Sequence, residues 1–254
     1  MLITNDDGIF APGIRALIDI MRGLGEVVVV APDQPMSGTG HAITVRHPLR
    51  VQKIREEKGY LEYSCNGTPV DCVKLGEQVV LKKKPDLLVS GINHGSNASI
   101  NIIYSGTMAA VLESAIGGVP SIGFSLLDYS HHADFTHCAP YVRKITEKVL
   151  THGLPDSVCL NVNIPAVNGD NIKGIKICRQ GRSRWVEKFD SRIDPHKQDY
   201  YWLTGHFEKL EDNEDTDQWA LENNYVSVVP VHFDLTAHYA LATLQNWKLD
   251  AEKG

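Results

Sequence analysis

The 254-residue sequence predicts an α/β protein built on a mostly parallel, doubly wound sheet. Three observations support this fold class. Short apolar runs alternate with segments of helical periodicity from residue 1 to about residue 165. The apolar run at 27–30 is β-branched and continuous, which is typical of a strand covered on both faces. Polar and glycine-containing turns follow these runs, where parallel sheets carry their ligand-binding loops.

The N-terminal segment predicts a strand, a helix and a second strand. Residues 1–4 are apolar or β-branched and run into the polar turn 5–8, as expected at the end of a buried strand. Pro12 suits the first turn of a helix that ends near residues 23–25. This helix has one apolar stripe at i, i+3, i+4 and i+7, formed by Ile14, Leu17, Ile18 and Met21. The β-branched run 27–30 predicts the second strand.

An alternating apolar pattern between residues 43 and 64 predicts a β-hairpin inserted between α/β units. The charged run 55–58 is interpreted as the solvated tip of this hairpin. The next helix begins with a capping box, in which Thr68 is the N-cap, Pro69 is the first helical residue and Asp71 completes the box.

Strands and helices continue to alternate in the second half of the core. A buried strand is predicted over 87–89, followed by the polar loop 90–97. A helix over 108–116 comes next, with Thr107 as its predicted N-cap. The remaining elements are a strand, a helix and a strand over 120–124, 141–150 and 158–162.

The pattern changes near residue 165, which predicts two regions. Residues 1–165 form the α/β core, and residues 166–254 form an arm or hairpin extension that is not an independent domain. The extension is richer in aromatic and charged residues, with an acidic stretch at 208–217 and a strand-like run at 226–231. We expect it to contact a partner subunit.

The composition excludes several classes of protein. A formal charge of −6 argues against nonspecific binding to nucleic acid or to an anionic membrane. The five cysteines are widely spaced without a C-x-x-C motif, so we expect buried free thiols in a reducing compartment. We find neither a signal-peptide pattern nor an apolar run of membrane-spanning length. The sequence therefore predicts a soluble, cytoplasmic protein.

Oxygen-bearing side chains follow the predicted strands at one edge of the sheet. Asp6 and Asp7 are adjacent carboxylates after the first strand, Ser37 follows the second and Asn93 follows the strand at 87–89. Two neighbouring carboxylates repel each other unless a cation or a shared proton relieves them. An all-oxygen set suits Mg²⁺ or Mn²⁺ better than zinc. The alternative is a simple turn in which the aspartates cap the next helix.

The run from Tyr104 to Thr107 leads directly into a helix and predicts an anion-binding site. The hydroxyls of Ser105 and Thr107, and the N–H groups from Gly106 onward, can hold phosphate oxygens. A plain N-cap is the alternative, and Thr107 can serve both purposes. The dinucleotide fingerprint, the P-loop and the G-x-S-x-G nucleophile motif are absent from the sequence.

Several motifs occur together in an order that resembles the SurE (survival protein E) family. These motifs lie at residues 4–9, 31–38, 66–72, 90–97 and 104–107, with further similarity at 200–205, 216–217 and 226–236. The resemblance covers nearly the whole chain.

This resemblance implies a Rossmann-like core and a metal-dependent phosphatase, chiefly a 5′-nucleotidase with some 3′-nucleotidase activity. It implies one divalent ion per subunit, Mg²⁺ or Mn²⁺, held by Asp6, Asp7, Ser37 and Asn93. Asp6 or Asp7 would also act as general acid or base. It further implies a homodimer or homotetramer with exchanged C-terminal arms, with no membrane and no stable nucleic-acid partner. Phosphate and substrate contacts are expected from Asn5, Asn93, Asn97, Ser105, Gly106 and Thr107.

The sequence is also compatible with two other functions. An aspartyl-phosphate phosphatase would use Asp6 as nucleophile, although that class has an Asp-x-Asp motif and Asp6 and Asp7 are adjacent. A receiver-like signalling domain also places an acidic pair after its first strand. It needs a phosphate-accepting aspartate after its third strand, where this chain has Ser90 and Asn93.

Overall fold

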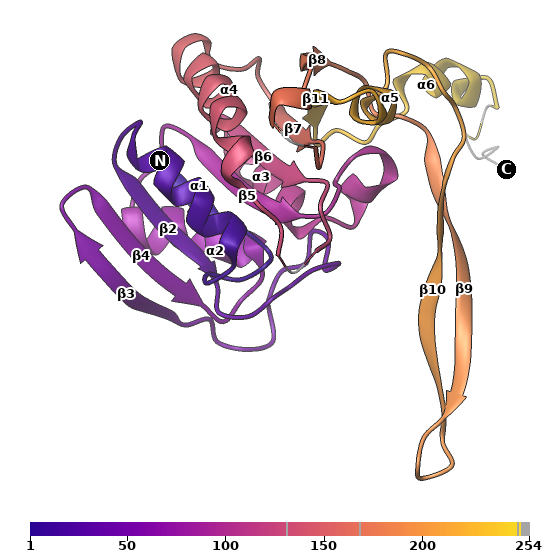
Figure 1. Cartoon of the computed structure of the whole chain (residues 1–254), viewed down its shortest axis with the longest axis horizontal. Helices are drawn as coiled ribbons and strands as arrows, with labels where there is room; N and C mark the ends of the chain where they lie inside the picture. Colours follow the sequence, from indigo (N-terminus) through magenta and orange to yellow (C-terminus); the bar gives the residue numbers. More distant parts are fainter. Residues whose placement is uncertain (131, 168, 248, 250–254) are drawn as a thin grey trace, which may run out of the picture.

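A computed structural model describes residues 1–130, 132–167, 169–247 and 249 of the chain. It contains a nine-stranded sheet and a two-stranded antiparallel hairpin (Figure 1). The strands of the large sheet are β1 (Leu2–Thr4), β2 (Val27–Pro32), β3 (Val51–Glu57), β4 (Tyr60–Cys65), β5 (Leu88–His94), β6 (Ser121–Leu126), β7 (Val158–Ile164), β8 (Gly174–Ile177) and β11 (Tyr225–His232). The hairpin consists of β9 (Ser183–Ile193) and β10 (Asp199–Lys209).

The helices follow the predicted alternation with the strands. The α-helices are α1 (Pro12–Arg22), α2 (Pro69–Leu75), α3 (Gly106–Ile116), α4 (Ala139–His152), α5 (Asp217–Glu222) and α6 (His238–Gln245). A π-helical turn (Gly76–Leu81) extends α2, and a 3-10 helix, η2 (Ser99–Ile103), precedes α3. The capping box of α2 is confirmed, since the Thr68 hydroxyl accepts the N–H of Asp71 and the Asp71 carboxylate accepts the N–H of Thr68.

The strand order confirms a Rossmann-like, mostly parallel sheet. The order is β3-β4-β2-β1-β5-β6-β7-β11-β8, and the six strands from β4 to β7 are mutually parallel. The chain builds outward from β1 through β2 to β4, then returns to the other side of β1 with β5. The carboxyl ends of β1 and β5 therefore flank the point where the strand order reverses, which is where such sheets bind ligands.

Helices cover both faces of this sheet, as the doubly wound pattern predicts. Ile3 belongs to the apolar core under α1 and α4, and its neighbour Leu2 belongs to the core under α2 and α3. Val27 and Val28 divide between the two cores in the same way. Because successive side chains of a strand point to opposite faces, a continuous apolar run fills both layers.

Several predicted boundaries are wrong. The first hairpin begins at Val51 rather than Ile43, and its second strand, β4, pairs parallel with β2 and is part of the main sheet. Strand β5 continues to His94 because residues 93 and 94 pair with β6, so Asn93 lies on a strand and not in a loop. The N-cap of α3 is Ser105 rather than Thr107, since the Ser105 hydroxyl accepts the N–H of Met108.

Part of the segment after residue 165 belongs to the sheet, and part of it forms a projecting hairpin. Strands β8 and β11 extend the sheet past the predicted boundary, because β11 pairs antiparallel with β7 and carries β8 on its far edge. The hairpin β9–β10 projects far from the sheet (Figure 1). All five cysteines are buried and free, as predicted. Over the described part of the chain, we find no helix long and apolar enough to cross a membrane.

Candidate functional site

Asp6 lies two residues after the end of β1, and its carboxylate is buried against the first turn of α3. Its Oδ1 accepts a hydrogen bond of 2.5 Å from the Thr107 hydroxyl. Gly106 lies directly beside it, and a Cβ at Gly106 would lie 2.8 Å from the Asp6 Cβ and 2.9 Å from its Oδ2. The absence of a side chain at residue 106 therefore lets the helix N-terminus approach the carboxylate closely.

Asp7 is less buried and connects β1 to β5. Its Oδ2 accepts the backbone N–H of His94 at 3.0 Å. Asp6 lines the pocket described below, whereas Asp7 does not. The two carboxylates are therefore held by different neighbours, Asp6 by α3 and Asp7 by β5.

Burial of this acidic pair raises the pKa of both carboxyls. Desolvation raises the pKa of Asp6 from 3.8 to about 6, repulsion from Asp7 adds to the shift, and the Thr107 hydroxyl opposes it. Desolvation also raises the pKa of Asp7, against the lowering effect of the His94 N–H. A cation at this position would favour the charged form of both groups.

The loop after β2 brings Ser37 to the same edge of the sheet. The N–H of Met36 donates to the carbonyl of Asp6 at 2.7 Å, and the N–H of Gly40 donates to the carbonyl of Tyr104 at 3.2 Å. These two bonds connect the loop to the end of β1 and to the segment before α3. Ser37 itself is exposed on the pocket wall.

Asn93 is buried on β5 and faces the same pocket. Its Nδ2 donates to the carbonyl of Gly95 at 2.9 Å, a bond that leaves the Oδ1 as a possible ligand atom. Asn93, Asp6 and Ser37 thus supply three oxygen-bearing side chains from three adjacent strand ends.

Asn97 is anchored by strands β6 and β7. Its Nδ2 donates to the Ser125 hydroxyl at 2.8 Å and its N–H donates to Asn163 Oδ1 at 2.9 Å. Its carbonyl accepts the Nδ2 of Asn161 at 2.8 Å. Asn97 still lines the pocket, but its amide nitrogen is used inside the protein.

A pocket of about 530 Å³ opens in front of these residues. Five of the predicted site residues line it, namely Asp6, Ser37, Asn93, Asn97 and Ser105. Four others do not: Asp7 lies beside Asp6, Gly106 and Thr107 lie behind the Asp6 carboxylate, and Asn5 donates its Nδ2 to the carbonyl of Gly8. The Oδ1 of Asn5 is buried with no hydrogen-bond partner among the described residues.

Most of the far wall of this pocket is not predicted from the sequence. That wall comes from the hairpin, with Trp185 and Glu187 on β9 and residues 203–205 on β10. Tyr104 and Tyr129 add aromatic surface near it. The aromatic content of residues 166–254 indicated that this region has surface able to contact a ligand or a partner. The periodicity of a strand does not show which distant loop the strand will contact.

Comparison with known proteins agrees with the resemblance in the sequence. A family model described as "Survival protein SurE" matches residues 1–187. A protein of Flavobacterium psychrophilum named 5′-nucleotidase SurE is 60% identical over 251 residues, covering 98% of both chains. A protein of Flavobacterium johnsoniae with the same name is 57% identical over 251 residues, covering 98% of this chain and 97% of that one.

A solved structure supports the same assignment. The crystal structure of the SurE protein from Aquifex aeolicus has a TM-score of 0.84 and 43% sequence identity to this chain. The match covers 97% of this chain and 98% of that chain, so it includes the hairpin and the strands after it. With the family model matching most of the chain and relatives matching nearly all of it, this chain belongs to the SurE family.

Proposed function

We propose that this protein is a metal-dependent 5′-nucleotidase that hydrolyses nucleoside 5′-monophosphates, and also 3′-monophosphates, to nucleoside and phosphate. The names of its relatives support the 5′-nucleotidase activity. The observation that carries the proposal is the acidic pair of buried Asp6 and half-buried Asp7 at the switch point of the sheet, near Asn93 and at the edge of a nucleotide-sized pocket.

The donor set fits one hard divalent ion, Mg²⁺ or Mn²⁺. Asp6, Asp7, Ser37 and Asn93 would hold it through oxygen atoms alone. Among the residues that the structure describes, no three His, Cys, Asp or Glu side chains converge, so the amide and the hydroxyl are needed to complete the set. The raised pKa of Asp6 fits this assignment, because two buried like charges are relieved by a cation.

When bound, the ion would neutralise phosphate charge and make a coordinated water more acidic. The protein's own residues position the reactants. Thr107 holds the Asp6 carboxylate. The N–H of His94 holds Oδ2 of Asp7, and Oδ1 of Asp7 would accept from the attacking water. The N-terminus of α3 favours the negative charge of a phosphate beside Ser105. Phosphoryl transfer depends mainly on such positioning and charge neutralisation.

The far side of the pocket suits the nucleoside. Tyr104, Tyr129 and Trp185 present aromatic surface, and Trp185 is oriented by donating its Nε1–H to Asn101 Oδ1 at 2.9 Å. Base–aromatic stacking tolerates different bases because every base has a π-face. We therefore expect the pocket to accept nucleotides with different bases rather than to select one base.

The C-terminal segment supports the proposed assembly by exchanged arms. Leu235 is 93% exposed and Tyr239 is 91% exposed, and further apolar side chains on and after α6 are also exposed. Apolar surface of this kind marks an interface. We propose a homodimer or homotetramer in which these arms pack on a second copy of the chain.

The two alternatives have less support. Strand β5, which pairs with β1 on the side away from β2, takes the place of a receiver's third strand. It ends with Asn93 and His94 and offers no aspartate there for a receiver-like phosphorylation. An aspartyl-phosphate route would leave a labelled protein after mixing with a labelled nucleotide and acid quenching. Acid-stable label on Asp6 during turnover would establish this route.

The test is phosphate release from a panel of 5′- and 3′-nucleoside monophosphates by the full-length protein. Each nucleotide is assayed with EDTA, with Mg²⁺ and with Mn²⁺. We expect release from 5′-monophosphates with one or both metals, weaker release from 3′-monophosphates, and none with EDTA. Release that persists in EDTA would contradict metal dependence, and no release under any condition would contradict the nucleotidase assignment.

A further inference from the structure

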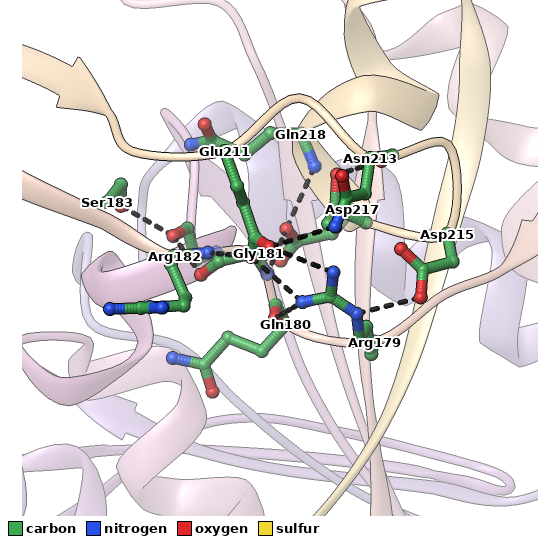
Figure 2. Close-up of polar contacts among 12 residues, drawn as sticks. Arg179, Gln180, Gly181, Arg182, Ser183, Glu211, Asn213, Asp215, Asp217 and Gln218 are labelled. Carbon is green, nitrogen blue, oxygen red and sulfur yellow. Dashed lines mark hydrogen bonds and ion pairs between the residues drawn. The ribbon is translucent and has the colours of Figure 1, made fainter.

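The hairpin β9–β10 forms one wall of the pocket, yet few contacts join it to the core. The residues that connect the two regions therefore decide where this wall stands. The polar contacts between the described parts of the two regions include Trp185 with Asn101, Lys209 with Glu222, and a group at the base of β9 around Asp217 (Figure 2).

Asp217 is fully buried at the start of α5, and its carboxylate accepts three backbone N–H groups. Oδ1 accepts from Gly181 at 2.9 Å and from Gln218 at 2.8 Å, and Oδ2 accepts from Ser99 at 2.7 Å. Desolvation raises the pKa of this carboxyl, while the N–H groups lower it. A single carboxylate thus joins α5, Gly181 two residues before β9, and Ser99, the first residue of η2.

The hydroxyl of Ser99 also joins η2 to the base of the hairpin. It donates to the carbonyl of Gly181 at 2.6 Å and lies 2.5 Å from the hydroxyl of Ser183, the first residue of β9. Ser99 has a positive φ of 55°, a conformation that a serine adopts only when its surroundings hold it there. Trp185 lies two residues beyond Ser183 on the pocket wall.

The solvent-exposed side of the hairpin base is held differently. Arg179 makes a two-pronged pair with Glu211, at 2.8 and 2.9 Å, and its Nε contacts Asp215 at 2.8 Å (Figure 2). Exposed ion pairs of this kind contribute little to stability, whereas a buried carboxylate with three donors is costly to disturb. Asp217 is therefore the dominant polar connection of the base.

The phosphate end of the pocket is fixed without Asp217. Asn97 is held by β6 and β7, and Thr107 holds Asp6. The wall that carries Trp185 depends instead on the contacts of Ser99 and Asp217 at the base of β9.

We infer that Asp217 is a positioning residue that, through Gly181 and Ser99, sets the distance between the hairpin wall and the phosphate end of the pocket, and so governs recognition of the nucleoside part of the substrate. This inference rests on the proposed nucleotidase function.

The test compares two substrates in the full-length protein with metal: a nucleoside 5′-monophosphate, and p-nitrophenyl phosphate, which lacks ribose and base. The variant is Asp217→Asn, which loses one acceptor oxygen. The matched control is Asp215→Asn, two residues away and exposed. We expect Asp217→Asn to raise the KM for the nucleotide about tenfold with little change in kcat, and to leave kcat/KM for p-nitrophenyl phosphate unchanged. Asp215→Asn should alter neither substrate.

A second variant covers the case in which Asp217→Asn does not fold, as judged by circular dichroism. Ser99→Ala keeps the backbone N–H to Asp217 and removes only the hydroxyl contacts to Gly181 and Ser183. It should shift the nucleotide KM in the same direction by a smaller factor.

An equal loss with both substrates in a folded variant, or no change with either, would overturn the inference while leaving the nucleotidase assignment intact. If the wild type hydrolyses neither substrate, the proposed function fails and the inference fails with it.

Discussion

The hydroxyl of Thr107 donates to Oδ1 of Asp6 at 2.5 Å across 101 residues of sequence. This bond joins the first turn of α3 to the end of β1, and it is buried. It explains why the hydroxyl of Thr107 does not cap α3, a role that Ser105 fills. One predicted phosphate ligand thus orients a predicted metal ligand.

Replacement of Thr107 by valine should weaken both stability and activity. Valine has nearly the same shape but leaves the buried carboxylate without this donor, at a cost of about 1–3 kcal/mol in the free energy of unfolding at pH 7. Urea unfolding and phosphate release measure the two effects. Thr107→Ser retains the donor and should stay close to wild type in both; if serine behaves like valine, the hydroxyl is not the cause.

The stability of the metal-free protein should depend on pH through Asp6. Its pKa rises from 3.8 to about 6 on folding, so the folded chain binds more protons between these values than the unfolded chain does. The contribution of Asp6 to the free energy of unfolding therefore falls as the pH rises from about 4 to about 6.

Asp6→Asn isolates this contribution, since an amide carries no charge and its oxygen still accepts from Thr107. In EDTA at pH 7 the variant should be more stable than the wild type by roughly 2–3 kcal/mol, and the difference should shrink toward pH 4. Urea unfolding across this pH range measures it. A difference that does not vary with pH would contradict the burial effect.

Gly106→Ala should reduce activity although alanine favours helices. The added Cβ would lie 2.8 Å from the Asp6 Cβ, so the carboxylate or the helix must move. We expect phosphate release to fall at least about tenfold. Gly25→Ala is the control, because its Cβ would meet only the Met1 Cε, at 3.6 Å. Equal activities of the two variants would show that close approach at residue 106 is unimportant.

The C-terminal arm should determine the oligomeric state. The double variant Leu235→Asp/Tyr239→Asp places charges at two highly exposed apolar positions. Because a charge opposes burial in an apolar interface, light scattering should show a shift toward monomer. Val79→Asp places a charge at another exposed apolar position, away from the arm, and should leave the mass unchanged. A wild-type protein that is monomeric at all concentrations would contradict the exchanged-arm proposal.

The sequence predicted the features that depend on local patterns. The buried run at 27–30, the apolar stripe of α1 and the capping box at Thr68 each follow from neighbouring residues, and the structure confirms them. Asp6, Ser37 and Asn93 could be grouped because parallel strands bring their carboxyl ends to one edge.

The features that the sequence did not predict depend on distant contacts. The extension of β5 through Asn93 comes from pairing with β6, and the position of β11 comes from antiparallel pairing with β7. Trp185 reaches the pocket because a long hairpin is anchored at Asp217, which no periodicity within β9 reveals. Asn97 likewise depends on two buried strands for its orientation.

The most direct test of the central claim is metal-dependent phosphate release by wild type, Asp7→Asn and Asp19→Asn after removal of bound metal with EDTA. Asp19 is an exposed aspartate on α1, so its replacement controls for the change in charge. The account predicts that Mg²⁺ or Mn²⁺ restores 5′-nucleotide hydrolysis in the wild type and in Asp19→Asn, and that Asp7→Asn stays folded with activity reduced by orders of magnitude. Full activity of Asp7→Asn, or wild-type activity without added metal, would contradict it.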